Sequence, residues 1–140
     1  MTEESTTPDL MELGGQAFEA GSHHDLNAII RFYASDAVLD MSTVGLGTYE
    51  GAGAIIEFIE GWWATFEDHV LEQEETLDLG HGVLFSTVRE VGRLAGSDGR
   101  VEQQRGWVTV WVGSKIVYHA FYGDIDEARA AAERLAHERG

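Results

Sequence analysis

The sequence predicts an α+β fold, a curved antiparallel sheet wrapped around helices. Two observations predict it. The apolar residues recur at helical spacing through most of the first half of the chain, and from about residue 69 they alternate with period two. Tight turns at 96–99 and 113–114 then separate successive strands, so that strands adjacent in sequence pair antiparallel. The expected order is α-α-β-α-β-β-β-β-α, and such a sheet closed by helices forms a cone with an apolar interior.

The first half of the chain accounts for the first four elements of this order. Helical spacing predicts a first helix over residues 9–21, and Asp25 is a suitable N-cap for a second helix. A short strand is expected at 37–41 and a loop at 45–51. A third helix is expected over 52–66. Its apolar stripe consists of Ile55, Ile59, Trp62 and Phe66.

The second half supplies the remaining strands and the last helix. Alternating residues predict strands at 69–79, 83–94, 101–112 and 116–122. A capping box opens a final helix over 124–138, which is rich in alanine and arginine.

Length and composition limit the kinds of protein this chain can be. Its 140 residues suffice for one domain, and we expect a loose N-terminal arm over 1–8 followed by a single domain over 9–140. The absence of cysteine excludes a disulfide scaffold and a thiol nucleophile. The N-terminus is acidic, unlike a secretory signal, and no apolar run approaches the ~18 residues of a membrane-spanning helix. We therefore expect a cytoplasmic protein with no membrane partner.

Charge and motifs argue against several further classes of function. Nine Lys and Arg residues against 25 Asp and Glu residues give a net charge of −16, which repels phosphate backbones, so no nucleic-acid partner is expected. The tandem His23-His24 lies in no metal-binding motif, and Gly45-Leu46-Gly47 lacks the lysine of a phosphate-binding loop. We expect no metal and no cofactor.

Large aromatic residues on the late strands suggest a second copy of the chain as partner. Trp107, Thr109 and Trp111 share one face of their strand, and Tyr118 and Tyr122 share one face of the next. Aromatic residues are enriched in subunit interfaces. If these residues form the outer face of the sheet, a second subunit covers it, and the sequence predicts a homodimer.

Three motifs resemble the nuclear transport factor 2-like superfamily, and within it the SnoaL-like branch. They are Tyr-Ala-x-Asp-Ala-Val at 33–38, Glu50-Gly51 opening a helix, and Gly-x-Lys-Ile at 113–116 entering the last strand, within a resemblance that spans about 10–139. The segment 40–47 resembles that of a bacterial, actinobacterial subgroup. The resemblance implies the superfamily's cone fold. The superfamily includes polyketide cyclases, ketosteroid isomerase, limonene epoxide hydrolase, dehydratases and transport adaptors, so the resemblance does not imply one function.

The resemblance also allows the catalytic patterns of these relatives to be compared with this chain. The base of ketosteroid isomerase falls at Met41, one position after Asp40, and its other two groups fall near Ala17 and Gly106. The Asp-Arg-Asp relay of the epoxide hydrolase has no counterpart. Val117-Tyr118-His119 is similar to a Val-Glu-His segment of the polyketide cyclases, with Tyr118 in place of the acid and the histidine retained.

Asp40 and His119 are the candidate bases. Asp40 closes an apolar strand, where a raised pKa suits a base, although it is also placed to cap the loop that follows. His119 lies in an apolar strand, and the ordinary pKa of histidine suits acid–base work. The alternative for His119 is a core or interface histidine bonded to the backbone.

Arg89 is the candidate for stabilising negative charge that develops on a substrate. It lies among apolar residues and shares a face with Phe85 and Thr87. If it is buried, Asp40 or Glu102 is the expected partner, or else a substrate oxygen. The alternative is an exposed arginine at the edge of the sheet.

The candidate ligand-binding residues are aromatic or apolar and come from the first strand, the third helix and the last strand. They are Tyr33, Met41, Trp62, Trp63, Phe66 and Phe121. For the residues of the third helix, simple core packing is the alternative.

Together these features favour a protein that binds a small apolar or cyclic molecule. As an enzyme it is expected to be a cofactor-free isomerase, cyclase or dehydratase that uses Asp40 or His119 as base. The alternatives are a ligand-binding pocket without chemistry and a protein-interaction adaptor, in each case a dimer.

Overall fold

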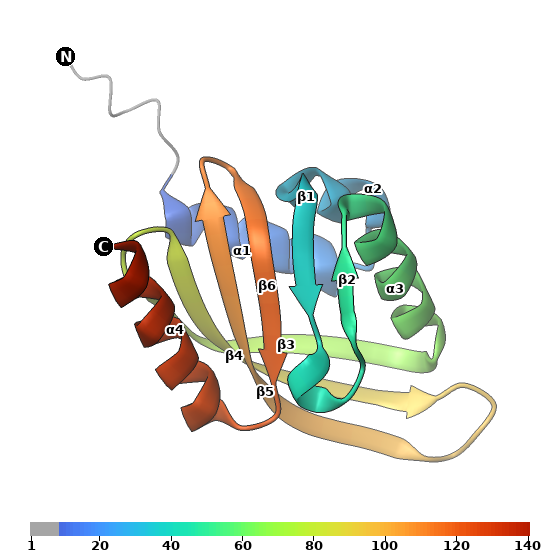
Figure 1. The fold of residues 1–140 in the computed structure, drawn as a ribbon. Helices are drawn as coiled ribbons and strands as arrows, with labels where there is room; N and C mark the ends of the chain where they lie inside the picture. The colour runs from blue at the N-terminus through green and yellow to red at the C-terminus, as the bar shows by residue number, and fades with distance from the viewer. Residues whose placement is uncertain (1–8) are drawn as a thin grey trace.

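The computed structural model describes residues 9–140, so the arm predicted at 1–8 lies outside the described residues. Four α-helices and six strands follow one another over this range (Figure 1). They are α1 (Leu10–Ser22), α2 (Leu26–Ile29), β1 (Tyr33–Asp40), β2 (Thr48–Glu50), α3 (Ala52–Ala64), β3 (Phe66–Asp78), β4 (Val83–Leu94), β5 (Arg100–Val112), β6 (Lys115–Tyr122) and α4 (Ile125–Arg139).

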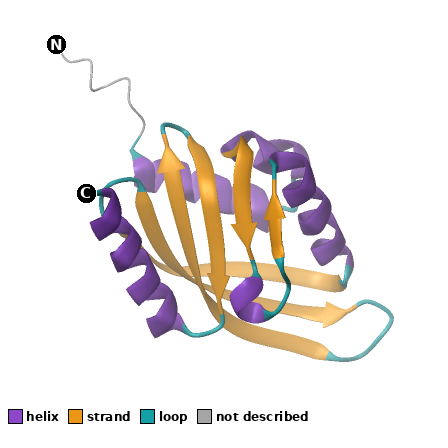
Figure 2. Ribbon diagram, in the orientation of Figure 1, coloured by secondary structure: helices purple, strands orange, loops and turns teal. Residues whose placement is uncertain are grey.

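All six strands belong to one sheet in the order β2-β1-β6-β5-β4-β3. β6 lies between β5 and β1. It runs antiparallel to β5 and parallel to β1, and the β1–β6 pair is the only parallel pair of this sheet. The long strands β3, β4 and β5 bend away from the others, so the sheet is strongly curved and does not close (Figure 2). The predicted α+β arrangement is confirmed.

The structure adds one strand to the prediction and moves several boundaries; β1, for example, begins at Tyr33 rather than at residue 37. Thr48–Glu50 lies in the predicted loop but pairs antiparallel with β1, Asp40 opposite Thr48. Gly45 and Gly47 have positive φ angles, which allow the chain to turn back tightly enough for this pairing. β3 begins at Phe66, because α3 ends two residues earlier.

The two faces of the sheet are covered by different helices. Buried residues of α1 and α2 pack with the inner face in one core cluster, to which Leu39, Leu84 and Trp111 belong. On the opposite face the alanines of α4 pack against Val108 and Ala120 in a second cluster. Helices therefore cover both faces of the sheet (Figure 1).

This arrangement corrects the predicted dimer face. Trp107 and Trp111 do share a face of β5, but that face points inward, and the outer face carries Val108 and Val110 instead. The smaller β-branched residues admit α4 at close range, whereas the bulky rings fill space on the concave side. Tyr118 and Tyr122 are half-buried beside the α4 cluster. Dimerisation stays a prediction, and of the four aromatic residues only Tyr118 and Tyr122 are still placed to take part in it.

Gly106 is the position that lets α4 approach the sheet. A Cβ atom at this residue would overlap the Cβ of Ala128 and lie 3.5 Å from the ring of Phe85. The absence of a side chain on β5 and the small side chains on α4 therefore fit each other.

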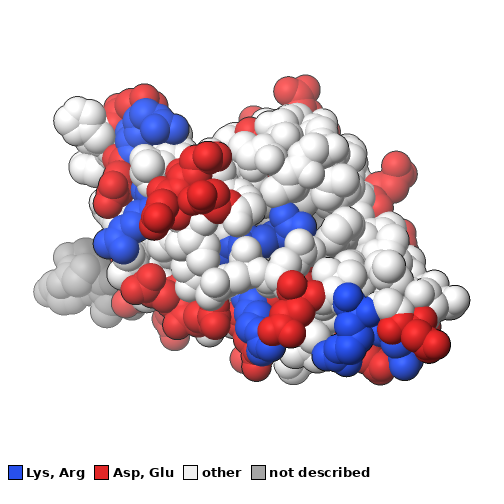
Figure 3. Space-filling model, turned by 90° about the horizontal axis from the view of Figure 1, so that it is seen from below, with Lys and Arg blue, Asp and Glu red and all other residues white. Residues whose placement is uncertain are grey.

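Charged side chains of both signs are interleaved on the outside of the molecule. Figure 3 shows acidic and basic residues side by side across the lower face. Arg93, for example, pairs with Asp68 at 3.1 Å. Within residues 9–140, no helix is both long and apolar enough to cross a membrane.

Candidate functional site

A cavity of about 110 Å³ lies between the concave face of the sheet and the helices α1 and α3. Its wall is mostly apolar, with side chains such as Leu39, Ile59 and Leu84. All four tryptophans of the chain line it. The cavity is therefore an aromatic, apolar compartment of the size of a small organic molecule, and the few polar groups on its wall decide which molecules it could accept.

His119 is one of these polar groups. It lies on β6, is 6% exposed, and its Nδ1 is 2.8 Å from the hydroxyl of Tyr33 on β1. Its ring packs against those of Trp107 and Phe121, with centroids 5.3 and 4.4 Å away. Its Nε2 is buried without a hydrogen-bond partner among the described residues.

Burial sets the protonation of this pair. It lowers the pKa of His119 from 6.5 to about 3, and it raises the pKa of Tyr33 above its ordinary value. At neutral pH the imidazole and the phenol are therefore both uncharged. His119 acts there as a neutral hydrogen-bonding group rather than as the cation that an ordinary pKa allows.

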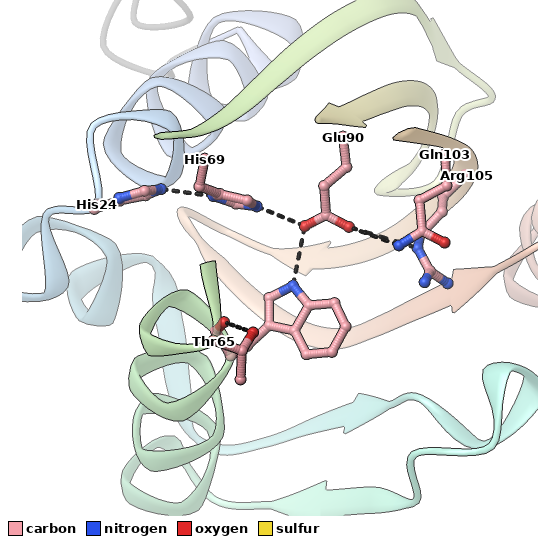
Figure 4. Close-up of polar contacts among 7 residues, drawn as sticks. His24, Thr65, His69, Glu90, Gln103 and Arg105 are labelled. Carbon is pink, nitrogen blue, oxygen red and sulfur yellow. Dashed lines mark hydrogen bonds and ion pairs between the residues drawn. The ribbon is translucent and has the colours of Figure 1, made fainter. Parts of the chain in front are cut away.

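A second polar group is centred on Glu90 of β4 (Figure 4). One carboxylate oxygen accepts from Nε1 of Trp62 at 2.9 Å and from Nε2 of His69 at 2.7 Å. The other oxygen accepts from Nε2 of Gln103 at 3.2 Å and lies 3.8 Å from Nε of Arg105. Glu90 is only 6% exposed, so the burial of its charge depends on these donors.

Two histidines connect Glu90 with the surface. Nδ1 of His69 lies 2.7 Å from Nε2 of His24, and the two rings stack with centroids 4.9 Å apart. His24 also stacks on Trp63 at 4.7 Å and is an exposed residue of the turn between α1 and α2. The line from His24 through His69 to Glu90 thus runs from solvent to the cavity wall (Figure 4).

The environment keeps Glu90 ionised. Burial acts to raise the pKa of Glu90, but the hydrogen bonds from His69 and Trp62, with the charges of His69 and Arg105, outweigh it. The pKa of Glu90 therefore lies below the ordinary 4.5. Burial, followed by the nearby His69, also lowers the pKa of His24.

Most of the aromatic and apolar residues singled out from the sequence lie on the cavity wall. They are Tyr33, Met41, Trp62, Trp63 and Phe121. Phe66 lies behind the wall, where its ring stacks on His69 at 4.9 Å.

The structure does not bring Asp40 to the cavity. Its carboxylate accepts from the backbone and hydroxyl of Ser42 at 3.0 and 2.5 Å and from the Tyr118 hydroxyl at 2.8 Å. Partial burial acts to raise the pKa of Asp40, but the hydrogen bonds from Ser42, Tyr118 and Thr48 together lower it. The expectation of a raised pKa is thus corrected, and Asp40 stabilises the loop after β1, as the alternative had it.

Arg89 also faces away from the cavity. It shares the outer face of β4 with Phe85 and Thr87, and its side chain is 39% exposed. It donates to Glu102 on β5 and to Glu72 on β3, the latter at 2.8 Å. The expectation that Arg89 stabilises charge inside the cavity is therefore corrected. Arg89 instead forms exposed ion pairs that connect β3, β4 and β5.

The site residues that sequence reasoning missed are the polar cluster of His24, His69, Glu90, Gln103 and Arg105, and the two tryptophans assigned to the dimer face, Trp107 and Trp111. Alternation along β4 places Glu90 on the same face as Leu84, Ser86 and Val88, so a carboxylate on an apolar face was a usable signal. His69 carried no such signal, since a register shift between Glu67 and Val70, with a positive φ at Asp68, sets the direction of its side chain.

Comparison with known proteins extends this description. The profile of the SnoaL-like domain family matches residues 15–119. No curated protein matches the chain.

Solved structures share the fold at low sequence identity. A candidate SnoaL-like polyketide cyclase from Shewanella putrefaciens superposes with a TM-score of 0.73 at 14% identity, covering 92% of this chain and 98% of that one. A hypothetical protein with a ketosteroid isomerase-like fold from Catenulispora acidiphila, in complex with trimethylamine, gives 0.71 at 15%, covering 90% and 93%. TerC, co-crystallised with polyporic acid, gives 0.71 at 13%, covering 89% and 98%. These similarities confirm the predicted cone fold, and the actinobacterial subgroup stays a prediction.

Proposed function

Because the chain belongs to the SnoaL-like domain family, we propose that it binds a small apolar or cyclic molecule in the cavity beneath its curved sheet. One observation carries the proposal. The cavity has an apolar, aromatic wall, and a buried nitrogen, Nε2 of His119, is left there without a partner in the described residues. Buried polar atoms are nearly always hydrogen-bonded, so this atom fits a ligand that brings its own polar group.

The structural neighbours support the same class of ligand. TerC was co-crystallised with polyporic acid, and the Catenulispora protein is in complex with trimethylamine. Both are organic molecules rather than nucleic acids or peptides. We propose that this chain, too, takes an organic molecule.

Intrinsic fluorescence tests the proposal, because all four tryptophans line the cavity. Titration with toluene is expected to change the emission saturably, and native mass spectrometry of the purified protein is expected to detect a bound small molecule. Ala17→Leu extends a side chain of α1 into the cavity and is expected to abolish the response. Ala130→Leu, on the exposed side of α4, is the matched control and is expected to leave it unchanged.

Two results would contradict the proposal. One is an emission that toluene does not change in a protein that carries no small molecule by mass spectrometry. The other is a response that survives in Ala17→Leu while that variant stays folded by circular dichroism.

The line from His24 to Glu90 favours a second candidate function, proton transfer on the bound molecule. Glu90 is on the cavity wall and ionised at neutral pH, the state that a base requires. In this candidate, Glu90 takes a proton from a carbon of the ligand, the bonding pair moves into the ligand, and a proton is later returned to it. His69 and His24 act as positioning residues that connect Glu90 with solvent.

Hydrogen–deuterium exchange tests this candidate. In D₂O, the protein is expected to accelerate exchange of the carbon-bound protons next to the carbonyl of cyclohexanone, as measured by proton NMR. Glu90→Gln is expected to abolish the acceleration, and Glu72→Gln, outside the cavity, is expected to keep it. Equal rates with and without protein exclude proton transfer on this compound but leave binding intact.

A further inference from the structure

Two residues that line the cavity each have a buried ring nitrogen without a hydrogen-bond partner in the described part of the chain. These nitrogens are Nε1 of Trp107 on β5 and Nε2 of His119 on β6. The two residues are diagonal neighbours on the concave face, because Thr109 is the residue directly opposite His119 and Trp107 is opposite Phe121. Their ring centroids are 5.3 Å apart, with the rings nearly perpendicular at 67°.

The bond to Tyr33 determines which form of His119 faces the cavity. The Tyr33 hydroxyl has Nδ1 of His119 as its only partner among residues 9–140. If the hydroxyl donates to Nδ1, the hydrogen of the neutral imidazole is on Nε2, and only this N–H remains unpaired. If Nδ1 carried the hydrogen, both the phenol proton and Nε2 would be unpaired. The first arrangement leaves fewer buried polar atoms unsatisfied, so Nε2 is a donor.

Trp107 can only donate, because an indole nitrogen has no free acceptor site. Because the two donors are neighbours, one acceptor can serve both, and a carbonyl oxygen with two lone pairs fits this requirement. Both donors are neutral, and the cation on the wall, Arg105, already faces Glu90 at 3.8 Å. Burying an anion in the same apolar cavity as the ionised Glu90, with no free cation to pair it, is unfavourable, which selects a neutral oxygen over a carboxylate.

We propose that Trp107 and His119 together bind a neutral carbonyl oxygen on the ring of the ligand, as in a cyclic ketone or a quinone. The inference rests on the proposed binding function and specifies its ligand class. Nε1 of Trp107 and Nε2 of His119 donate to the oxygen, while the apolar wall holds the ring. Tyr33 is the positioning residue that keeps the hydrogen of His119 on Nε2.

Two probes of similar shape test this proposal, cyclohexanone and methylenecyclohexane, which carries a carbon in place of the oxygen. Titration of the ¹⁵N-labelled protein is followed through the indole N–H signals, with that of Trp107 assigned from its loss in Trp107→Phe. Cyclohexanone is expected to move this signal downfield and to bind about fivefold to tenfold tighter than the hydrocarbon, the effect of one hydrogen bond or somewhat more.

The variant Trp107→Phe keeps a six-membered aromatic ring on the wall and removes the N–H together with the rest of the five-membered ring. Because both probes meet the lost volume, cyclohexanone is expected to weaken about fivefold more than methylenecyclohexane. Trp111→Phe is the matched control, because Nε1 of Trp111 already donates to Oγ1 of Thr109 at 2.9 Å. It is expected to affect both probes equally.

The outcomes separate the two proposals. If both probes bind with equal affinity and the Trp107 signal does not move, the carbonyl site is refuted while the binding function stands. If neither probe nor toluene binds, the binding function fails, and the carbonyl site fails with it. Should Trp107→Phe not fold, the comparison of the two probes on the unmodified chain still decides.

Discussion

Replacing Glu90 by glutamine tests the polar side of the cavity most directly. The carboxylate accepts three hydrogen bonds at 2.7, 2.9 and 3.2 Å, from His69, Trp62 and Gln103. An amide offers one acceptor oxygen, and its NH₂ group would face one of these donors. Breaking a buried charged pair in this way costs about 3–5 kcal/mol, so we expect the free energy of unfolding to fall by that amount.

The effect of Glu90→Gln is expected to depend on pH. Because the pKa of Glu90 is lower in the folded chain than the ordinary 4.5, the carboxylate stabilises the fold fully above that pH. The contribution is lost as the pH falls through the folded value. The difference between the two proteins is therefore expected to be largest at neutral pH and to shrink once the pH falls below 4.5.

Urea unfolding followed by tryptophan fluorescence measures both effects. Glu72→Gln is the control, since it removes an acidic partner of the exposed Arg89, and we expect a far smaller change. If Glu90→Gln lowers the free energy of unfolding by less than about 1 kcal/mol at neutral pH, the reasoning is refuted. So small an effect is typical of an ion pair exposed to water, not of a buried carboxylate.

Three further predictions follow from the fold and the site. Gly106→Ala brings a Cβ atom onto the Cβ of an alanine of α4, and we expect it to lower the free energy of unfolding in urea by about 1–3 kcal/mol. Gly53→Ala is the control, because open space surrounds that position, and it is expected not to destabilise the fold. Wild-type stability is expected to decline as the pH falls from 6.5 toward about 3, because His119 takes up its proton only when unfolded, and His119→Gln is expected to weaken this decline in pH-dependent melts. Arg89→Ala and Asp40→Asn are expected to leave toluene affinity unchanged in fluorescence titrations, and a severalfold loss would return these side chains to the site.

Local pattern was sufficient to predict most of the fold. Period and turn signals identify the long helices and the four long strands, because each depends on residues close in sequence. β2 was missed for the opposite reason. Three residues carry no period, and they form a strand only because β1 lies beside them.

Choosing the inner face of each strand was harder than finding the strand. Both faces of β5 are apolar, with Trp107 and Trp111 on one and Val108 and Val110 on the other, so alternation alone does not tell which meets the cavity. The packing of α4 determines the outer face, because its alanines fit against the smaller Val108 and Val110.

The polar site depends on contacts between distant parts of the chain. Glu90 is 21 residues from His69, and His69 is 45 residues from His24. No motif spacing encodes such a line, because three separate elements bring it together. His119, by contrast, was identified from its own strand, where it is the one histidine in a largely apolar and aromatic run.

The open sheet leaves β3 as a thirteen-residue outer strand, with backbone N–H and C=O groups along it that another chain could join. Carboxylates accompany these groups along the strand. They belong to Glu67, Asp68, Glu72, Glu74, Glu75 and Asp78. Two molecules that meet edge to edge bring these like charges together, and the resulting repulsion opposes the growth of intermolecular sheets. Acidification neutralises the carboxylates, so clear solutions of the protein are expected to become turbid at low pH before the fold itself is lost.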